Sequence, residues 1–151
     1  MTAEQFLNQV RQLQAAIRAK EERLAELRTL AEKCTAVLST APGGTHSNRT
    51  LESMLERILA EEEEQDALRL RLGAAYCAIS DTLYALDNNP SRTLLREYYL
   101  DGQSVPQLAA RYDRTNRAIR VRLQQARESF AMAYASRTHS DCIPDSPVMT
   151  E

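Results

Sequence analysis

The amino-acid sequence predicts an all-α protein. Its 151 residues include no tryptophan, two phenylalanines and four glycines, and most of its apolar residues are leucine, alanine and isoleucine, a mixture that favours helices. Two long segments, each of about 36 to 40 residues, repeat apolar side chains at alternating steps of three and four residues. A shorter C-terminal region contains capping and turn residues that suit three short helices. We therefore expect a long N-terminal helical hairpin, a coiled coil, followed by a three-helix unit.

The first long helix is predicted from an apolar seam that begins near the N-terminus. Its steps alternate between four and three residues, as in a heptad repeat, and only the polar Lys20 interrupts it. The helix should stop at Pro42, Gly43 and Gly44, which are unfavourable inside helices. The seam positions are Phe6, Val10, Leu13, Ile17, Lys20, Leu24, Leu27, Ala31, Cys34 and Leu38.

The second long helix repeats this pattern in a single register. Its centre is polar, so we expect the packing between the two helices to be weakest there. The predicted seam positions are Leu51, Leu55, Ile58, Glu62, Gln65, Arg69, Leu72, Tyr76, Ile79, Leu83 and Leu86.

A short loop between two long helices favours an antiparallel hairpin. If Leu38 lies level with Leu51, oppositely charged residues meet across the pair. The same seam would equally serve a parallel homodimer through the first helix, so both arrangements stay open. The ion pairs expected in the hairpin are Arg28 with Glu61, Arg23 with Asp66, and Glu21 and Glu22 with Arg69.

The heptad pattern breaks near residue 88. Asn89 followed by Pro90 is typical of a helix N-terminus, with asparagine as the N-cap and proline at the first helical position. Asp101 and Gly102 should end that helix. The tail after residue 135 contains two prolines and no periodicity, so we expect disorder there. The predicted organisation is a helical hairpin in 1–88, a compact helical domain in 89–135 and a disordered tail in 136–151.

Positive charge is concentrated in one part of an acidic chain. The net charge of the whole sequence is −2, but the stretch from Ser104 to Phe130 contains six arginines and two acids. That stretch therefore carries +4 and the remainder of the chain carries −6. A local excess of this kind is typical of a small nucleic-acid-binding surface.

The basic stretch has the signals of two helices joined by a tight turn. Ser104 can cap the first helix with Pro106 in its first turn, Asp113 and Arg114 form the turn, and Thr115 can cap the second helix. Helix periodicity places one set of apolar side chains toward a common core. These are Leu108, Ala109 and Tyr112 in the first helix and Ile119, Leu123, Ala126 and Phe130 in the second.

The opposite face of the second helix carries the candidate functional residues. A helix-turn-helix protein places its second helix in the major groove of DNA, where the N-terminal residues meet base edges. Arginine can make paired hydrogen bonds to guanine, and asparagine or glutamine can do so to adenine. We assign base contacts to Asn116, Arg117, Arg120 and Gln124, and phosphate contacts to Arg114, Thr115, Arg122 and Arg127.

These residues resemble a known family. The segment from about Asn89 to Phe130 is similar to region 4 of sigma-70-type RNA polymerase sigma factors. The matching residues are Tyr99 to Gly102, Ser104-Val105, Leu108-Ala109, Thr115, Ile119, Arg122-Leu123 and Ala126-Arg127. The match covers less than a third of the chain, and it departs from the family at Asp113, which is usually glycine, and at Arg114, which is usually apolar.

The resemblance implies a DNA-binding transcriptional regulator. A long coil before such a module resembles the small sigma-like regulators of phages and prophages, and it implies double-stranded DNA and RNA polymerase as partners. Nothing in the sequence resembles the sigma segments that bind the −10 element or melt the promoter. The alternative is an interaction protein that binds RNA polymerase or another protein through its coil without recognising a DNA sequence.

The sequence gives little support to other classes of function. We expect a cytoplasmic protein, because no apolar run approaches the length of a membrane span and no basic, apolar leader is present at the N-terminus. Cys34, Cys77 and Cys142 lack metal-ligand spacing, and Cys34 and Cys77 should lie on apolar helix faces. No metal, cofactor or catalytic constellation is expected, so we do not expect an enzyme.

Overall fold

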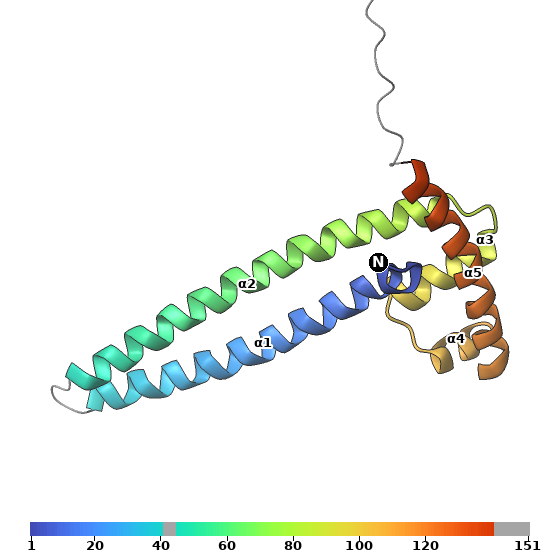
Figure 1. Ribbon diagram of the computed structural model, residues 1–151. Helices are drawn as coiled ribbons and strands as arrows, with labels where there is room; N and C mark the ends of the chain where they lie inside the picture. The colour runs from blue at the N-terminus through green and yellow to red at the C-terminus, as the bar shows by residue number, and fades with distance from the viewer. Residues whose placement is uncertain (41–44, 141–151) are drawn as a thin grey trace, which may run out of the picture. The chain divides into compact units, whose positions relative to one another are not determined.

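The computed structural model describes residues 1–40 and 45–140, and it confirms the all-α class. The elements are α1 (Ala3–Thr40), α2 (Thr45–Tyr84), α3 (Asn89–Leu95), the π-helical turn η1 (Arg96–Leu100), α4 (Val105–Arg111) and α5 (Asn116–Ser140) (Figure 1). The predicted glycine turn, 41–44, and most of the predicted tail, 141–151, lie outside the described residues. None of the helices in the described ranges is long and apolar enough to cross a membrane.

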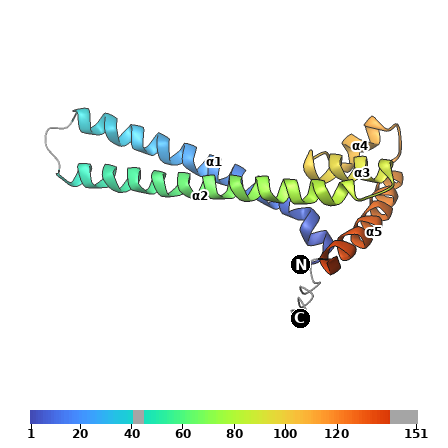
Figure 2. The same ribbon diagram turned by 90° about the horizontal axis from the view of Figure 1, so that it is seen from above.

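The chain divides into two compact units that do not coincide with the ranges expected from the sequence. The hairpin unit contains Gln12–Ala74, and the C-terminal unit contains Met1–Arg11 together with the chain from Ala75 onward. The first three turns of α1 and the end of α2 therefore belong to the unit that contains α3, α4 and α5. Figure 2 shows these three shorter helices gathered together.

In the hairpin unit, α1 and α2 lie side by side and antiparallel. Leu24, Ala31 and Ile58 are buried between them, with Leu27, Leu51 and Met54 packed against this cluster. Ion pairs join the two helices. They are Arg28 with Glu62 at 2.7 Å, Arg23 with Glu61 at 4.0 Å and Glu21 with Arg69 at 3.7 Å.

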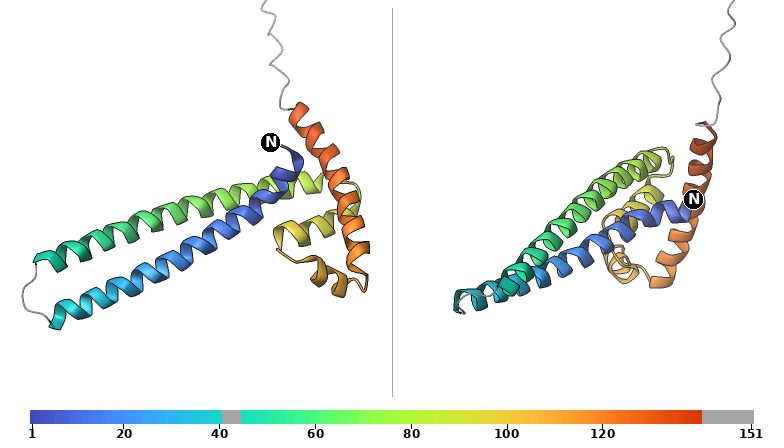
Figure 3. Two further views of the ribbon diagram at one scale, coloured as in Figure 1. Left: turned by 60° about the horizontal axis from the view of Figure 1, so that its bottom comes forward. Right: turned by 60° about the vertical axis from the view of Figure 1, so that its left-hand side comes forward.

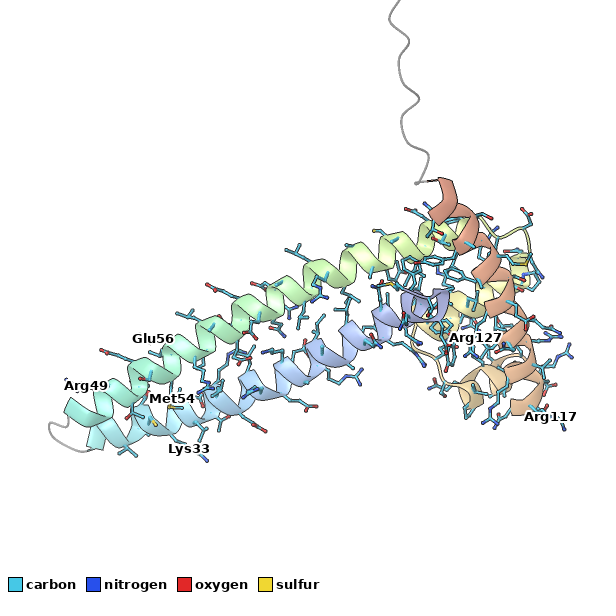
Figure 4. All side chains as sticks on the ribbon, viewed as in Figure 1. Lys33, Arg49, Met54, Glu56, Arg117 and Arg127 are labelled. Carbon is cyan, nitrogen blue, oxygen red and sulfur yellow. The ribbon has the colours of Figure 1, made fainter. Side chains whose placement is uncertain are left out.

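The buried face of α2 differs from the predicted seam. Leu55 is 48% exposed, whereas Met54, one residue earlier, is half-buried, and Figure 4 shows Met54 directed toward α1. Met54 lies three residues after Leu51 and four before Ile58, so it continues the buried face, and the ammonium group of Lys20 pairs with both Glu61 and Glu64. A rotation of α2 that buried Leu55 would turn Glu61 away from Lys20. The pairing also raises the pKa of Lys20 and lowers that of Glu61.

In the C-terminal unit, the chain enters α3 one residue earlier than predicted. Asn88 is the N-cap, and its side chain accepts a hydrogen bond from the amide of Ser91 at 3.5 Å. α3 continues into η1, where the amide of Asp101 donates to the carbonyl of Arg96, five residues earlier. Gly102 then takes φ 72° and ends the helix. A left-handed backbone of this kind favours glycine, as the sequence predicts.

The turn between α4 and α5 has the hydrogen bonds of a Schellman motif. Asp113 takes φ 52°. The amide of Arg114 donates to the carbonyl of Ala109 at 2.9 Å, and the amide of Asp113 donates to the carbonyl of Ala110 at 3.4 Å. Asp113 thus takes a left-handed conformation at the position where the sigma region 4 pattern usually has glycine. Aspartate is tolerated there better than most residues, but its Cβ still costs free energy that glycine would not.

Two expectations about the second half of the chain were wrong. α5 continues through Ser140, so 136–140 are helical rather than part of a disordered tail. The hydroxyl groups of Ser136 and Thr138 donate to the carbonyls of Met132 and Tyr134 in the preceding turn, which is compatible with a continuing helix. Cys77 is exposed rather than on an apolar face, whereas Cys34 is half-buried beside the Met54 sulfur.

The left-handed turn generates a stability prediction. Asp113→Gly should raise the free energy of unfolding by about 0.5 to 1 kcal/mol, because glycine removes the Cβ strain at positive φ. Gly102→Ala is the matched reverse change: an added Cβ meets no atom within 4 Å, so only backbone strain acts. It should lower stability by about 1 kcal/mol. Urea denaturation followed by circular dichroism measures both changes, and a lower midpoint for Asp113→Gly would contradict the prediction.

Candidate nucleic-acid interface

A compact apolar core holds α3, α4 and α5 in a fixed relation. The cluster consists of Leu94 from α3, Leu108 and Ala109 from α4, and Ile119 and Leu123 from α5. All five are at most 7% exposed, so the three helices share one core. Removing one of the larger side chains would cost about 2 to 5 kcal/mol. The rotation of α5 is therefore set from its buried side.

Both helices of the turn begin with a side-chain cap. Ser104 and Gln107 form a capping box at the start of α4, where the Ser104 hydroxyl accepts from the Gln107 amide and the Gln107 carbonyl oxygen accepts from the Ser104 amide. Thr115 caps α5, because its hydroxyl accepts from the amide of Ala118 at 3.2 Å. The caps predicted from Ser104 and Thr115 are confirmed.

The exposed face of α5 carries the residues assigned to base contacts. Asn116, Arg117, Arg120 and Gln124 are all exposed, and Val121 between them is 51% exposed. Arg117 lies at the beginning of α5 with its side chain directed away from the other helices (Figure 4). The arrangement gives one side of α5 a row of donors that can face a ligand.

Among the described residues, four of the five arginines near the turn have no acidic partner. Arg111 is 3.7 Å from the buried carboxylate of Glu97. In the described part of the chain, no ion pair involves the exposed arginines that follow it, so their positive charge is available to an anion. These residues are Arg114, Arg117, Arg120 and Arg122.

Arg122 lies on the flank of α5 next to the start of α3. It lines a groove of about 470 Å³ together with Asn88, Asn89 and Gln125. Amide side chains beside an arginine can donate hydrogen bonds to phosphate oxygens. The groove brings Arg122 together with Gln125, which the sequence analysis did not select.

Arg127 has a different place from the one predicted. Its side chain is half-buried, its Nε donates to the Tyr99 hydroxyl at 2.6 Å, and its guanidinium lies 5.7 Å from the ring centres of Tyr98 and Tyr99. Tyr99 is 1% exposed. Arg127 therefore connects α5 to η1 inside the unit, with its Nε directed to Tyr99 rather than to solvent.

The hydroxyl of Tyr99 sits in a buried and charged environment. Burial raises the pKa of Tyr99, and the hydrogen bond from Arg127 partly opposes this effect. The hydroxyl therefore stays protonated at neutral pH while it accepts from the guanidinium. A hydrogen bond with one charged partner stabilises a fold more than a neutral pair does.

A second buried contact holds the end of α4. The Tyr112 hydroxyl donates to Glu97 at 2.8 Å, and burial together with this carboxylate raises the pKa of Tyr112. Tyr112 was expected on the apolar stripe of α4, but it is 37% exposed and contributes mainly through its hydroxyl. Glu97 has no apolar pattern to identify it, so sequence analysis did not select it.

The first residues of the chain also support α5. The ring of Phe6 lies 6.1 Å from that of Phe130 and 5.0 Å from that of Tyr134, and Leu7 and Val10 are fully buried. Figure 3 shows the first turns of α1 beside the C-terminal half of α5. Phe6 and Val10 were assigned to the coiled-coil seam, and Leu7 was not assigned. The rarity of phenylalanine in this chain is the signal that could have linked Phe6 with Phe130.

Comparisons of the chain with known protein families, curated proteins and solved structures found no match. The similarity of the 89–130 segment to sigma region 4 therefore stays a prediction.

The two environments of arginine on α5 generate a second prediction. Arg127→Ala should lower the free energy of unfolding by about 2 kcal/mol, because it leaves the buried Tyr99 hydroxyl without its charged partner. Arg120→Ala removes the same charge two helical turns earlier at an exposed site, and it should change stability by less than about 0.5 kcal/mol. Urea denaturation of both variants tests this difference. Equal effects would show that Arg127 is not a structural residue.

Proposed function

We propose that this protein is a DNA-binding transcriptional regulator that inserts the first half of α5 into the major groove of double-stranded DNA. The observation that carries the proposal is the exposed row formed by Arg117, Arg120 and Gln124 on a helix held from behind by a buried core. The tight turn before α5 and the exposed first turn of that helix support the proposal, because recognition helices meet base edges with their N-terminal residues.

Each residue of the row has a chemical role in this proposal. Arg117 and Arg120 present paired donors that suit the O6 and N7 acceptors of guanine, and Asn116 and Gln124 suit the N6 and N7 of adenine. These four residues supply sequence recognition. Because they leave α5 on one side, they can reach base edges along a single groove.

We assign the phosphate contacts to residues around the turn and on the flank of α5. Arg114 and Arg122 are exposed cations, and the free amides of the first turn of α5 suit an anion. The Thr115 hydroxyl already caps α5, so its contribution is to fix that first turn. Arg127 is no longer assigned to a phosphate, because its donors are directed to Tyr99.

The resemblance to sigma region 4 extends the proposal beyond DNA. It implies that the protein acts in the cytoplasm on transcription, with RNA polymerase as a protein partner, and that it is encoded by a phage or prophage. A homodimer through the N-terminal coil is a further partner arrangement that the heptad seam would serve. None of these assignments is required for the DNA contact itself.

The alternative function is an interaction protein whose coil binds another protein without recognising a DNA sequence. Exposed leucines in the hairpin unit favour this alternative. Leu30, Leu55 and Leu59 are 49%, 48% and 60% exposed. Protein partners commonly cover apolar side chains at their interfaces. The two functions predict different responses to salt, since only binding to several phosphates releases many counterions.

DNA binding is tested with a duplex selected by the purified protein from a random library. Affinity should fall linearly on a double-logarithmic plot against salt, with a slope of about −0.9 for each phosphate contacted. Arg117→Ala with Arg120→Ala should weaken binding at least about thirtyfold, because two guanine contacts are lost. The helical circular-dichroism signal should not change.

The control for this double variant removes two exposed arginines from the hairpin unit. Arg49→Ala with Arg57→Ala changes the net charge equally and should leave the affinity within about twofold, since neither residue lies near α5 in the sequence or in its unit. Selection of no duplex at low salt, or a flat response to salt, would support the interaction protein instead.

Salt dependence also separates the phosphate contacts from the structural arginine. Arg114→Ala should reduce the magnitude of the slope by about 0.9 and weaken binding to selected and unrelated duplexes alike. Arg127→Ala should weaken binding to the selected duplex while the slope stays unchanged. Fluorescence anisotropy across a salt series measures both. If Arg127→Ala reduced the slope of affinity against salt, Arg127 would have to contact a phosphate.

A further inference from the structure

One residue of the exposed row differs in kind from its neighbours. Val121 is 51% exposed and lies four residues after Arg117 and three residues before Gln124, on the same side of α5. Its immediate neighbour Arg120 is also exposed. Val121 thus places an apolar side chain at the centre of a polar and basic surface.

Packing within the unit does not explain this valine. The apolar residues of α5 that enter the core of α3, α4 and α5 are Ile119 and Leu123, and Ala126 and Phe130 continue the buried side. Val121 lies on the opposite side of the helix. A β-branched residue is also less favourable than alanine at an exposed helical position, because its rotamers are restricted there.

A base edge offers one apolar group to such a side chain. In the major groove, thymine alone presents a C5-methyl group, and the other features of the four base pairs are hydrogen-bond donors and acceptors. We propose that Val121 is a specificity-determining residue that recognises the methyl group of a thymine. This inference rests on the proposed DNA-binding function and deepens it by naming a base that the row selects.

The spacing along α5 places that thymine within the recognised site. Arg117 and Gln124 are seven residues apart, which corresponds to about 10 Å along a helix. This distance covers about three base pairs at 3.4 Å each. The thymine contacted by Val121 therefore lies between the base pairs contacted by Arg117 and Gln124.

The test uses the full chain and the duplex selected from a random library. Each thymine of the site is replaced in turn by deoxyuridine, which lacks the methyl group and keeps every hydrogen-bonding atom. Replacement at one central position should weaken binding of the wild-type protein about fourfold, the effect expected from one buried methyl group. Replacement at the other positions should have little effect.

The variant Val121→Ala should lose the discrimination. It should bind the thymine duplex about as weakly as the wild type binds the deoxyuridine duplex, and it should not distinguish the two. Arg120→Ala is the matched control on the same face. It should weaken binding to both duplexes and keep the fourfold preference for thymine.

The outcomes separate this inference from the function on which it rests. If the wild type binds every deoxyuridine duplex as tightly as the thymine duplex, Val121 does not recognise a methyl group although DNA binding stands. Persistence of the preference in Val121→Ala would likewise overturn the inference and assign the thymine to another residue. If no duplex is selected at all, the proposed function and the inference fail together.

Discussion

The apolar core shared by α3, α4 and α5 fixes how α5 is rotated, the hydrogen bond from Arg127 to the buried hydroxyl of Tyr99 fits that rotation, and the surfaces of the C-terminal unit depend on it. Arg127 can reach Tyr99 only when Ile119 and Leu123 face the core. The same rotation exposes Arg117 on the other side of the helix. The buried side of α5 therefore determines which side chains its first turns present to a ligand.

The arginines of α5 serve two purposes that differ in their surroundings. Arg127 packs against the rings of Tyr98 and Tyr99, and Arg11 lies 4.0 Å above the Tyr98 ring, so aromatic residues and cations form one structural cluster. Within the described ranges, Arg114, Arg117, Arg120 and Arg122 have no such partners, and their charge is exposed. An exposed cation strengthens binding to an anion but contributes little to stability. The division separates the part of α5 that supports the fold from the part that is free to bind.

Local signals in the sequence predicted the start and end of several elements, because caps and turns depend on neighbouring residues alone. The caps at Ser104 and Thr115, the helix end at Gly102 and the turn at Asp113 all belong to this class. The heptad steps likewise predicted two long helices. These features could be inferred without knowing which segments meet in space.

Contacts between distant segments could not be inferred in the same way. Arg120 and Arg127 are seven residues apart and leave the helix on nearly the same side, so periodicity treats them alike. Only the position of η1 beside the later turns of α5 distinguishes them. The face of α2 was misassigned for a similar reason, because only the contact with α1 shows that Met54, rather than Leu55, follows Leu51 on the buried face.

The departure from sigma region 4 at the turn now has a physical interpretation. Asp113 keeps the left-handed geometry that glycine would provide, and the amide of Arg114 closes the turn on Ala109. The backbone of Arg114 is thereby fixed while its side chain stays exposed beside the first turn of α5. An apolar residue at this position would add to the core or to an apolar surface, whereas arginine adds a cation next to the free amides of that turn. The sequence thus accepts some backbone strain at Asp113 and places an exposed charge at Arg114, and under the proposed function that charge would lie against the DNA backbone.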